Sequence, residues 1–210
     1  MIPFSKAKFL ISCLEAKDFP SLYAKRGVLC PEIAFVGRSN ACKSSLINHL
    51  TEKKDLVFVS STPGKTQLLN FFALENRLML VDLPGYGFAK IPKELKKTWG
   101  QRLSNYLENR PQLALLIFVL DLRRTLSEED KQMISWASFH QKKMLFVLSK
   151  SDKLSSSEKK LAEEALATSI ASHLKDKPTF LSYSIKEPSC RTALRQLITS
   201  LLGSHGTTQN

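Results

Sequence analysis

The chain has 210 residues, of which 43% are hydrophobic and 24% charged, a balance typical of a folded globular chain and not of a disordered one. Its 31 Lys and Arg against 19 Asp and Glu give a formal net charge of +12, which favours a polyanionic partner, either nucleic acid or an acidic membrane surface. The four cysteines are scattered without a Cys-x-x-Cys pair, which excludes a disulfide scaffold and a structural zinc as organising features and suits a reducing compartment.

The first twenty residues do not predict a targeting or membrane segment. Their short apolar stretch is interrupted by Lys6, Lys8, Glu15, Lys17 and Asp18. A signal peptide needs an uninterrupted apolar run, and a membrane helix needs about 20 apolar residues. We therefore expect a cytoplasmic protein without a membrane span.

Short apolar runs alternate with amphipathic stretches along the chain. Strands are expected at 33–36, 68–74, 78–81, 113–120, 144–148 and 179–181, and helices at 44–50, 93–107, 128–139, 157–174 and 192–202. Only three residues separate 68–74 from 78–81, too few for a crossover helix, so these two runs should form an antiparallel hairpin. The pattern predicts an α/β fold: a doubly wound, mostly parallel six-stranded sheet with one antiparallel strand and helices on both faces.

No linker divides the chain, which favours one domain. We expect this domain at residues 31–203, an N-terminal extension packed on it at 1–30, and a flexible tail at 204–210. Helix N-caps are expected at Thr125 and at Ser155–Ser157, because acidic residues follow each of them.

The first strand is followed by Gly37-Arg38-Ser39-Asn40-Ala41-Cys42-Lys43-Ser44-Ser45, which nearly matches GxxxxGK[ST]. In that loop, backbone N–H groups surround a nucleotide β-phosphate at a helix N-terminus. Lys43 would reach the β- and γ-phosphates, and the Ser44 hydroxyl would coordinate Mg²⁺. Cys42 stands where the motif has glycine. If residue 42 needs a positive φ, its Cβ costs roughly 1–3 kcal/mol, or about ten- to a hundred-fold in affinity.

The second hairpin run ends in Asp82-Leu83-Pro84-Gly85, an acidic residue followed by a turn. A carboxylate at the carboxyl end of a strand lies where open α/β sheets bind ligands. Asp82 could hold a water ligand of Mg²⁺, and the Gly85 N–H could meet the γ-phosphate. Taken alone, the segment is only a plausible turn.

The run 144–148 is followed by Ser149-Lys150-Ser151-Asp152. A carboxylate such as Asp152 accepts two hydrogen bonds from guanine, whereas adenine has no adjacent pair of donors and would leave the charge unpaired. The Lys150 stem could cover the base and ribose. The next strand leads into Ser182-Tyr183-Ser184-Ile185-Lys186, whose main-chain N–H groups could face the guanine O6. Taken alone, the segment 149–152 is more often a solvent-exposed Lys/Asp pair after a strand than a base-binding site.

These segments together resemble the motifs of translation-factor-related bacterial GTPases. The resemblance rests on Gly37–Ser45, Thr62-Pro63-Gly64-Lys65-Thr66-Gln67, Asp82-Leu83-Pro84-Gly85-Tyr86-Gly87, Ser149–Asp152 and Ser184–Lys186. More narrowly, nearly the whole chain resembles the EngB (YihA/YsxC) family of small GTPases, which assist assembly of the large ribosomal subunit and are often linked to division septum formation. Two positions depart from the family pattern: Cys42 replaces the loop glycine, and Ser149 replaces an Asn or Thr.

The resemblance implies further roles. Nucleotide contacts are expected from Gly64, Lys65, Thr66, Gln67 and Leu68, with Thr66 as a second Mg²⁺ ligand in a segment that switches with the γ-phosphate. Lys43, Thr66 and Asn40 would take part in catalysis, with Asn40 as the ligand of a stimulating K⁺ ion. Tyr86 occupies the place of a water-orienting glutamine, which implies slow intrinsic hydrolysis.

The positive charge has several clusters, of which Lys90, Lys93, Lys96, Lys97 and Arg102 adjoin the segment after Gly85. Solvated helix faces explain any one cluster. A basic surface that changes with the nucleotide could instead bind ribosomal RNA in one state and release it in the other. The implied partners are GTP, GDP and the large ribosomal subunit, with the protein itself a monomer.

Two alternatives remain open. A P-loop kinase that uses ATP does not explain Ser149–Asp152 or Thr66. A nucleotide-sensing RNA-binding scaffold with weak or no hydrolysis is kept because of Cys42.

Overall fold

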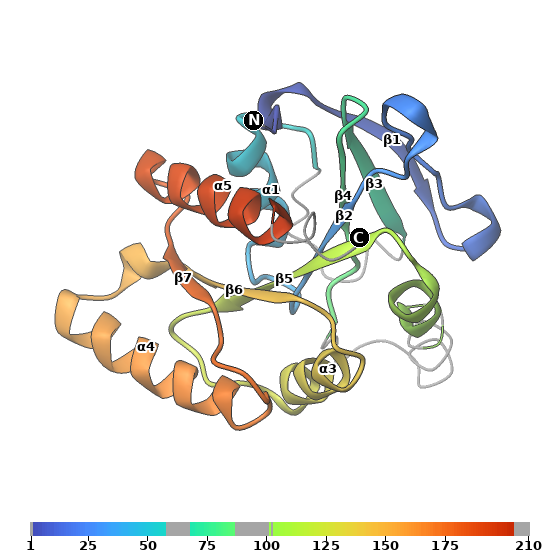
Figure 1. The fold of residues 1–210 in the computed structure, drawn as a ribbon. Helices are drawn as coiled ribbons and strands as arrows, with labels where there is room; N and C mark the ends of the chain where they lie inside the picture. The colour runs from blue at the N-terminus through green and yellow to red at the C-terminus, as the bar shows by residue number, and fades with distance from the viewer. Residues whose placement is uncertain (1, 58–67, 87–100, 102, 204–210) are drawn as a thin grey trace.

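The computed structural model describes residues 2–57, 68–86, 101 and 103–203, and Figure 1 shows its fold. Within these residues the strands are β1 (Ala7–Cys13), β2 (Glu32–Val36), β3 (Leu69–Leu74), β4 (Leu78–Asp82), β5 (Leu113–Asp121), β6 (Met144–Ser149) and β7 (Phe180–Tyr183). The helices are α1 (Lys43–Thr51), α3 (Glu128–Phe139), α4 (Ser156–Ala171) and α5 (Pro188–Gly203), and residues 103–109 are also helical. The predicted α/β architecture is confirmed.

Within the described ranges the sheet has seven strands in the order β1-β3-β4-β2-β5-β6-β7, so the predicted number of six is wrong. The additional strand is β1, which pairs antiparallel with β3 at one edge. Only its two end residues, Ala7 and Cys13, are buried. Its apolar run 9–11 is short, lies next to charged residues and is not among the strands expected from the sequence. As predicted, a single strand, β3, runs against all the others in the described sheet.

The predicted hairpin is formed by β3 and β4. The two strands pair antiparallel from Asn70 opposite Asp82 to Leu74 opposite Leu78. Glu75 takes a left-handed conformation (φ 51°) in the turn between them. The hairpin brings Asp82 to the same edge of the sheet as the carboxyl end of β2.

Helices cover both faces of the sheet, as Figure 1 shows. One hydrophobic cluster joins Ile33 and Phe35 of β2 to α1 and α5, and the other joins Ala34 and Val36 to α3, α4 and the helical residues 103–109. Alternate residues of one strand therefore serve two cores, which is why the apolar runs have no polar face.

The segment between β1 and β2 is fastened to the sheet by a buried carboxylate, that of Glu32. Arg110 donates to this carboxylate at 2.6 Å and the Tyr106 hydroxyl donates at 3.0 Å. Arg110 also donates to the carbonyl oxygen of Pro20, and the ring of Phe19 packs edge-on against Tyr106. This network lies at the amino end of β2, away from the candidate site described below.

Helix α3 spans Glu128–Phe139, as predicted, but its N-cap differs from the predicted one. Its N-cap is Ser127, not Thr125: Ser127 and Asp130 form a reciprocal capping box. The acidic residue three positions after Ser127 decides the cap, because it accepts a hydrogen bond from the cap's own N–H. The expected cap of α4 at Ser155 is confirmed by an equivalent box with Glu158.

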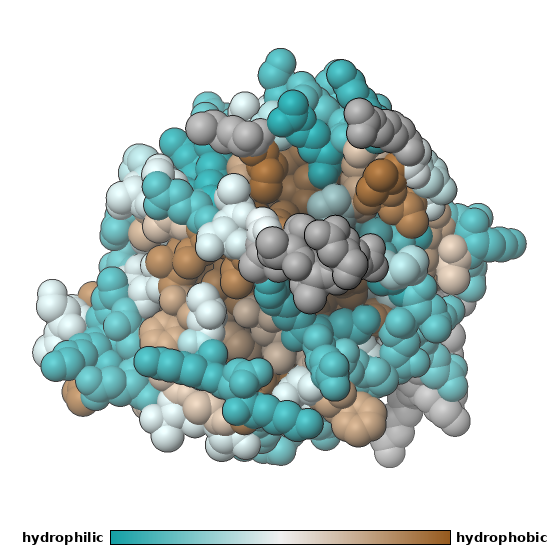
Figure 2. Space-filling model, viewed as in Figure 1, coloured by the Kyte–Doolittle hydropathy of each residue, from teal (hydrophilic) through white to brown (hydrophobic). Residues whose placement is uncertain are grey.

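The surface is mostly hydrophilic on the face drawn in Figure 2, where hydrophobic residues show mainly in recesses between polar ones. Among the described residues, none of the helices has the length and apolar character needed to cross a bilayer.

Candidate functional site

The loop between β2 and α1 has the backbone geometry of an anion-binding nest. Asn40 (φ 66°) and Cys42 (φ 67°, ψ 26°) are left-handed, and Cys42 is the N-cap of α1. A chain that alternates handedness turns successive N–H groups towards one point, and the helix N-terminus adds partial positive charge there. Residues 37–42 therefore form a concavity suited to phosphate. Residue 42 does have the positive φ at which, according to the sequence analysis, a side chain is costly.

Two glycines in the site lie where any side chain would collide with backbone. A Cβ on Gly37 would lie 2.5 Å from the carbonyl oxygen of Val119 in β5. A Cβ on Gly85 would lie 2.9 Å from the backbone nitrogen of Ser39. The segment after β4 thus packs directly on the phosphate loop, which brings two motifs 46 residues apart in sequence, from Ser39 to Gly85, into contact.

Lys43, Ser44 and Asp82 meet at the carboxyl edge of the sheet. The Lys43 ammonium lies 2.6 Å from Asp82 Oδ1, with both side chains largely buried, and the Ser44 hydroxyl lies 3.5 Å from Asp82 Oδ2. An ammonium, a hydroxyl and a carboxylate around an anion cradle are the donor set that a magnesium–nucleotide requires. The residues present fit both the phosphates and Mg²⁺.

The loop after β6 is attached to the phosphate loop. The Ser149 hydroxyl lies 3.0 Å from the carbonyl oxygen of Ala41 and 3.0 Å from that of Leu120. Lys150 is left-handed (φ 64°), and its Nζ lies 3.1 Å from the carbonyl oxygen of Asn40. Residues predicted to hold opposite ends of a nucleotide therefore support each other directly.

Asp152 follows in a short 3-10 turn (Ser151–Lys153), and its two carboxylate oxygens have different surroundings. Its Oδ1 accepts from the Ser184 hydroxyl at 3.1 Å. Its Oδ2 is buried and lies 3.1 Å from the Lys186 ammonium, at ion-pair distance but without hydrogen-bond geometry. Burial opposes ionisation, but Lys186 and Ser184 outweigh it and lower the pKa of Asp152. Within the part of the chain that the structure describes, this buried, ionised oxygen therefore has room for a further donor, and paired N–H groups such as those of guanine suit it.

The side chains around the end of β7 are divided between the site and the core. Ser184 and Lys186 contact Asp152, and Ile185 is 46% exposed. Tyr183 is fully buried with its hydroxyl 2.7 Å from His49 Nδ1, and Ser182 donates to Glu163. Ser182 and Tyr183 are also paired with Leu148 and Ser149 of β6, so the structure places both in the sheet and not in the loop that faces Asp152.

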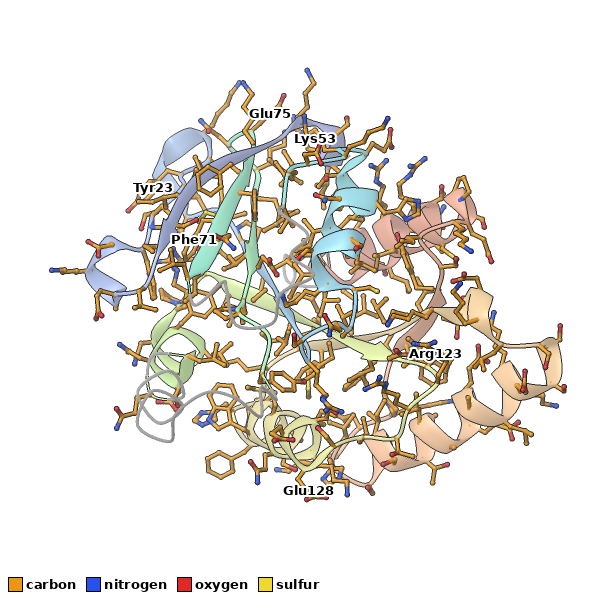
Figure 3. The ribbon with its side chains drawn as sticks, turned by 180° about the vertical axis from the view of Figure 1, so that it is seen from behind. Tyr23, Lys53, Phe71, Glu75, Arg123 and Glu128 are labelled. Carbon is orange, nitrogen blue, oxygen red and sulfur yellow. The ribbon has the colours of Figure 1, made fainter. Side chains whose placement is uncertain are left out.

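Sequence reasoning missed Asp121, the last residue of β5. Its carboxylate lies 3.0 Å from Lys150 Nζ and 2.8 Å from Arg123 Nη2, and the labelled Arg123 can be found in Figure 3 at the carboxyl end of β5. Burial raises the pKa of Asp121, but the bonds from Arg123 and Lys150 outweigh it and hold that pKa well below its ordinary value. The signal was present in the sequence: like Asp82, Asp121 is an acidic residue directly after an apolar run.

Some of the predicted residues lie outside the described part of the chain: Gly64, Lys65, Thr66 and Gln67, and the basic residues Lys90, Lys93, Lys96, Lys97 and Arg102. Leu68 is described and is 39% exposed next to β3. Ser45 lies in the first turn of α1.

Comparison with protein families and sequences gives consistent matches. A family model described as "50S ribosome-binding GTPase" matches residues 32–150. A protein named "Probable GTP-binding protein EngB" from Protochlamydia amoebophila (strain UWE25) is 48% identical over 156 residues, covering 74% of this chain and 76% of that protein. One of the same name from Pelobacter propionicus is 43% identical over 189 residues, covering 90% of both chains.

Solved structures show the same fold. The crystal structure of a probable GTP-binding protein engB aligns with a TM-score of 0.63 at 22% identity, covering 82% of this chain and 99% of that one. The apo translation elongation factor SelB from Methanococcus maripaludis aligns with a TM-score of 0.60 at 20% identity, covering 82% of this chain and 33% of that one.

Proposed function

Because the chain belongs to the EngB family of GTPases, we propose that it binds GTP and GDP and hydrolyses GTP as a conformational switch in assembly of the large ribosomal subunit. The observation that carries this proposal is the buried Asp152 Oδ2, on the same sheet edge as the Lys43–Asp82 pair. One end of this edge suits guanine and the other suits phosphates.

At the phosphate end, the backbone N–H groups of Asn40, Cys42 and Lys43 bind the β-phosphate, since those of Ser39 and Ala41 already donate to carbonyl oxygens. Lys43 exchanges its partner Asp82 for phosphate oxygens. When bound, Mg²⁺ would neutralise charge on the β- and γ-phosphates. Ser44 would be a direct ligand, and Asp82 would hold the ion through a water molecule. Thr66 is proposed as the second protein ligand.

At the base end, Asp152 accepts two hydrogen bonds from the guanine ring N–H and exocyclic amine. Adenine has no adjacent pair of N–H donors to offer this carboxylate, which disfavours ATP and hence the kinase alternative. Lys150 lies between the phosphate loop and Asp121, where its stem can cover the base and ribose.

Slow hydrolysis that K⁺ accelerates is a further part of the proposal. Asn40, in the left-handed turn of the phosphate loop, is the proposed K⁺ ligand. We expect faster GTP turnover in potassium than in sodium buffer, and Asn40→Ala should abolish the difference. Equal rates in both buffers for the unaltered protein would contradict this role.

The ribosomal partner is supported by the matched family and by the net charge of +12. A basic protein that contacts RNA phosphates releases counterions, so its binding weakens steeply as salt rises. We also propose a cytoplasmic monomer whose nucleotide-binding domain spans residues 31–203, with residues 1–30 packed on it and 204–210 as a flexible tail.

Calorimetry with GDP, GTP and ATP tests the nucleotide specificity, and co-sedimentation with large ribosomal subunits tests the partner. We expect binding of both guanine nucleotides and none of ATP, and subunit binding that depends on a non-hydrolysable GTP analogue. No heat with either guanine nucleotide at millimolar concentration would refute the proposal. Guanine nucleotide binding without turnover, alongside subunit binding, would favour the RNA-binding scaffold, for which the strained Cys42 is the motivating feature.

A further inference from the structure

Tyr86, the residue after Gly85, is hydrogen-bonded through its main chain to the phosphate loop. Its carbonyl oxygen accepts from the Ser39 N–H at 3.1 Å, and its own N–H donates to the Gly37 carbonyl at 3.4 Å. These bonds extend the parallel pairing of β2 and β4 by one bridge, between Arg38 and Tyr86. The position of the Gly85 amide is thus set by the residue that follows it.

The Tyr86 side chain connects the same residue to helix α3. Its ring is 5% exposed, and its hydroxyl donates to Asp130 Oδ1 at 2.7 Å. Asp130 is 2% exposed, and its Oδ2 accepts from both the N–H and the hydroxyl of Ser127 at 2.8 Å. One buried carboxylate therefore caps α3 and anchors the segment that packs on the phosphate loop. The labelled Glu128 in Figure 3 marks the first turn of this helix.

The chemistry of the pair favours a permanent bond between them. Burial, and next the charge of Asp130, raise the pKa of the Tyr86 phenol well above its ordinary value, so the hydroxyl stays a donor. The buried Asp130 oxygen would lose a short hydrogen bond if the phenol moved away. The side chain points into the core and is held there, so it is not free to orient a water molecule.

We propose that Tyr86 and Asp130 are positioning residues that hold the Gly85 amide in place for the γ-phosphate, and so set the preference of the site for GTP over GDP. This inference rests on the proposed function. GDP lacks the γ-phosphate, so its affinity depends on the phosphate loop and the base end and not on Gly85. A group fixed before binding contributes more affinity than one that must be ordered by the ligand.

The test is Tyr86→Phe, which removes one hydroxyl and keeps the ring. We expect the dissociation constant for a non-hydrolysable GTP analogue to rise about tenfold, the effect of losing a hydrogen bond to a charged group, with that for GDP unchanged. Asp130→Asn leaves one side-chain oxygen for the three donors that the carboxylate now serves, so it should weaken binding of the GTP analogue and also destabilise the cap of α3.

Tyr106→Phe is a matched control. Tyr106 is also a buried tyrosine, 1% exposed, and donates to the buried carboxylate of Glu32 at the far end of β2. It should lower thermal stability as Tyr86→Phe does and leave the ratio of the two dissociation constants unaltered. Equal weakening of both nucleotides by Tyr86→Phe, or no change in either, would overturn the inference. Failure of the unaltered protein to bind GDP would instead refute the proposed function.

Discussion

Replacing Cys42 by glycine should strengthen binding of both guanine nucleotides. Cys42 has φ 67° and ψ 26°, a left-handed conformation in which an L-residue is strained because its Cβ crowds the following carbonyl oxygen. The penalty is about 1–2 kcal/mol for an ordinary residue and absent for glycine. The phosphate cradle requires this conformation, so a bound nucleotide holds the strain in place.

The expected gain follows from how the strain divides between the free and bound loop. If the free loop relaxes fully, Cys42→Gly raises affinity by about 5- to 30-fold, the equivalent of 1–2 kcal/mol. If the free loop keeps the left-handed turn, the same free energy appears as greater stability of the folded protein, offset by about 0.4–1 kcal/mol of extra chain entropy in the unfolded state. The β-phosphate is common to GDP and GTP, so both should gain equally.

Isothermal titration with each nucleotide measures the gain in affinity, and thermal unfolding with and without GDP measures the gain in stability. Gln141→Gly is the matched control, because Gln141 is also left-handed (φ 53°) but follows α3. It should stabilise the protein without changing affinity. Weaker nucleotide binding by Cys42→Gly, or a GDP-saturated protein no more stable than the unaltered one, would refute the reasoning.

Two further predictions concern the base end and the α1–β7 contact. Asp152→Asn should weaken the binding of guanosine nucleotides by tenfold or more, because an unsatisfied donor costs roughly 1–3 kcal/mol. It should improve the binding of xanthosine nucleotides, whose C2 carbonyl accepts from the new amide. Competition binding measures both effects, and an unchanged base preference would count against Asp152. Burial, and then Arg191 and Arg195, lower the pKa of His49, which lies beside Tyr183, so the unfolded chain takes up the proton first. The contribution of His49 to stability should be fully present above about pH 6.5 and should be lost as the pH drops through the pKa of His49 in the folded protein. His49→Gln should flatten the dependence of the melting temperature on pH. Parallel curves for the two proteins would argue against this role of His49.

The sheet could be predicted from sequence wherever burial on two faces gives continuous apolar runs. The runs 113–120 and 144–148 are of this kind and correspond to β5 and β6. β1 could not be found in this way, because its apolar run 9–11 is only three residues long and is exposed at the edge of the sheet. Its place in the sheet depends on pairing with β3, a contact between segments about sixty residues apart.

The site could be predicted where one motif contains its own chemistry. The phosphate loop specifies a turn, a charge and a helix start within nine residues, and the helix α1 does begin at Lys43. The conformation of Cys42 could be stated only as a condition, since a cysteine gives no sign of positive φ. The location of the Tyr86 side chain could not be foreseen, because its partner Asp130 lies in a helix cap that the sequence placed two residues too early.

The base end depends on the phosphate end through contacts that no single motif contains. Lys150 Nζ lies between the Asn40 carbonyl and the Asp121 carboxylate, and the Ser149 hydroxyl contacts the Ala41 carbonyl. A shift of the phosphate loop therefore changes the acceptors of Lys150 and Ser149, which precede Asp152 by two and three residues. Since Asp121 is held ionised by Arg123 as well, this link keeps its charge across the physiological pH range. Base recognition and phosphate binding are for this reason expected to be coupled, so that loss of either end weakens the other by more than its own contacts.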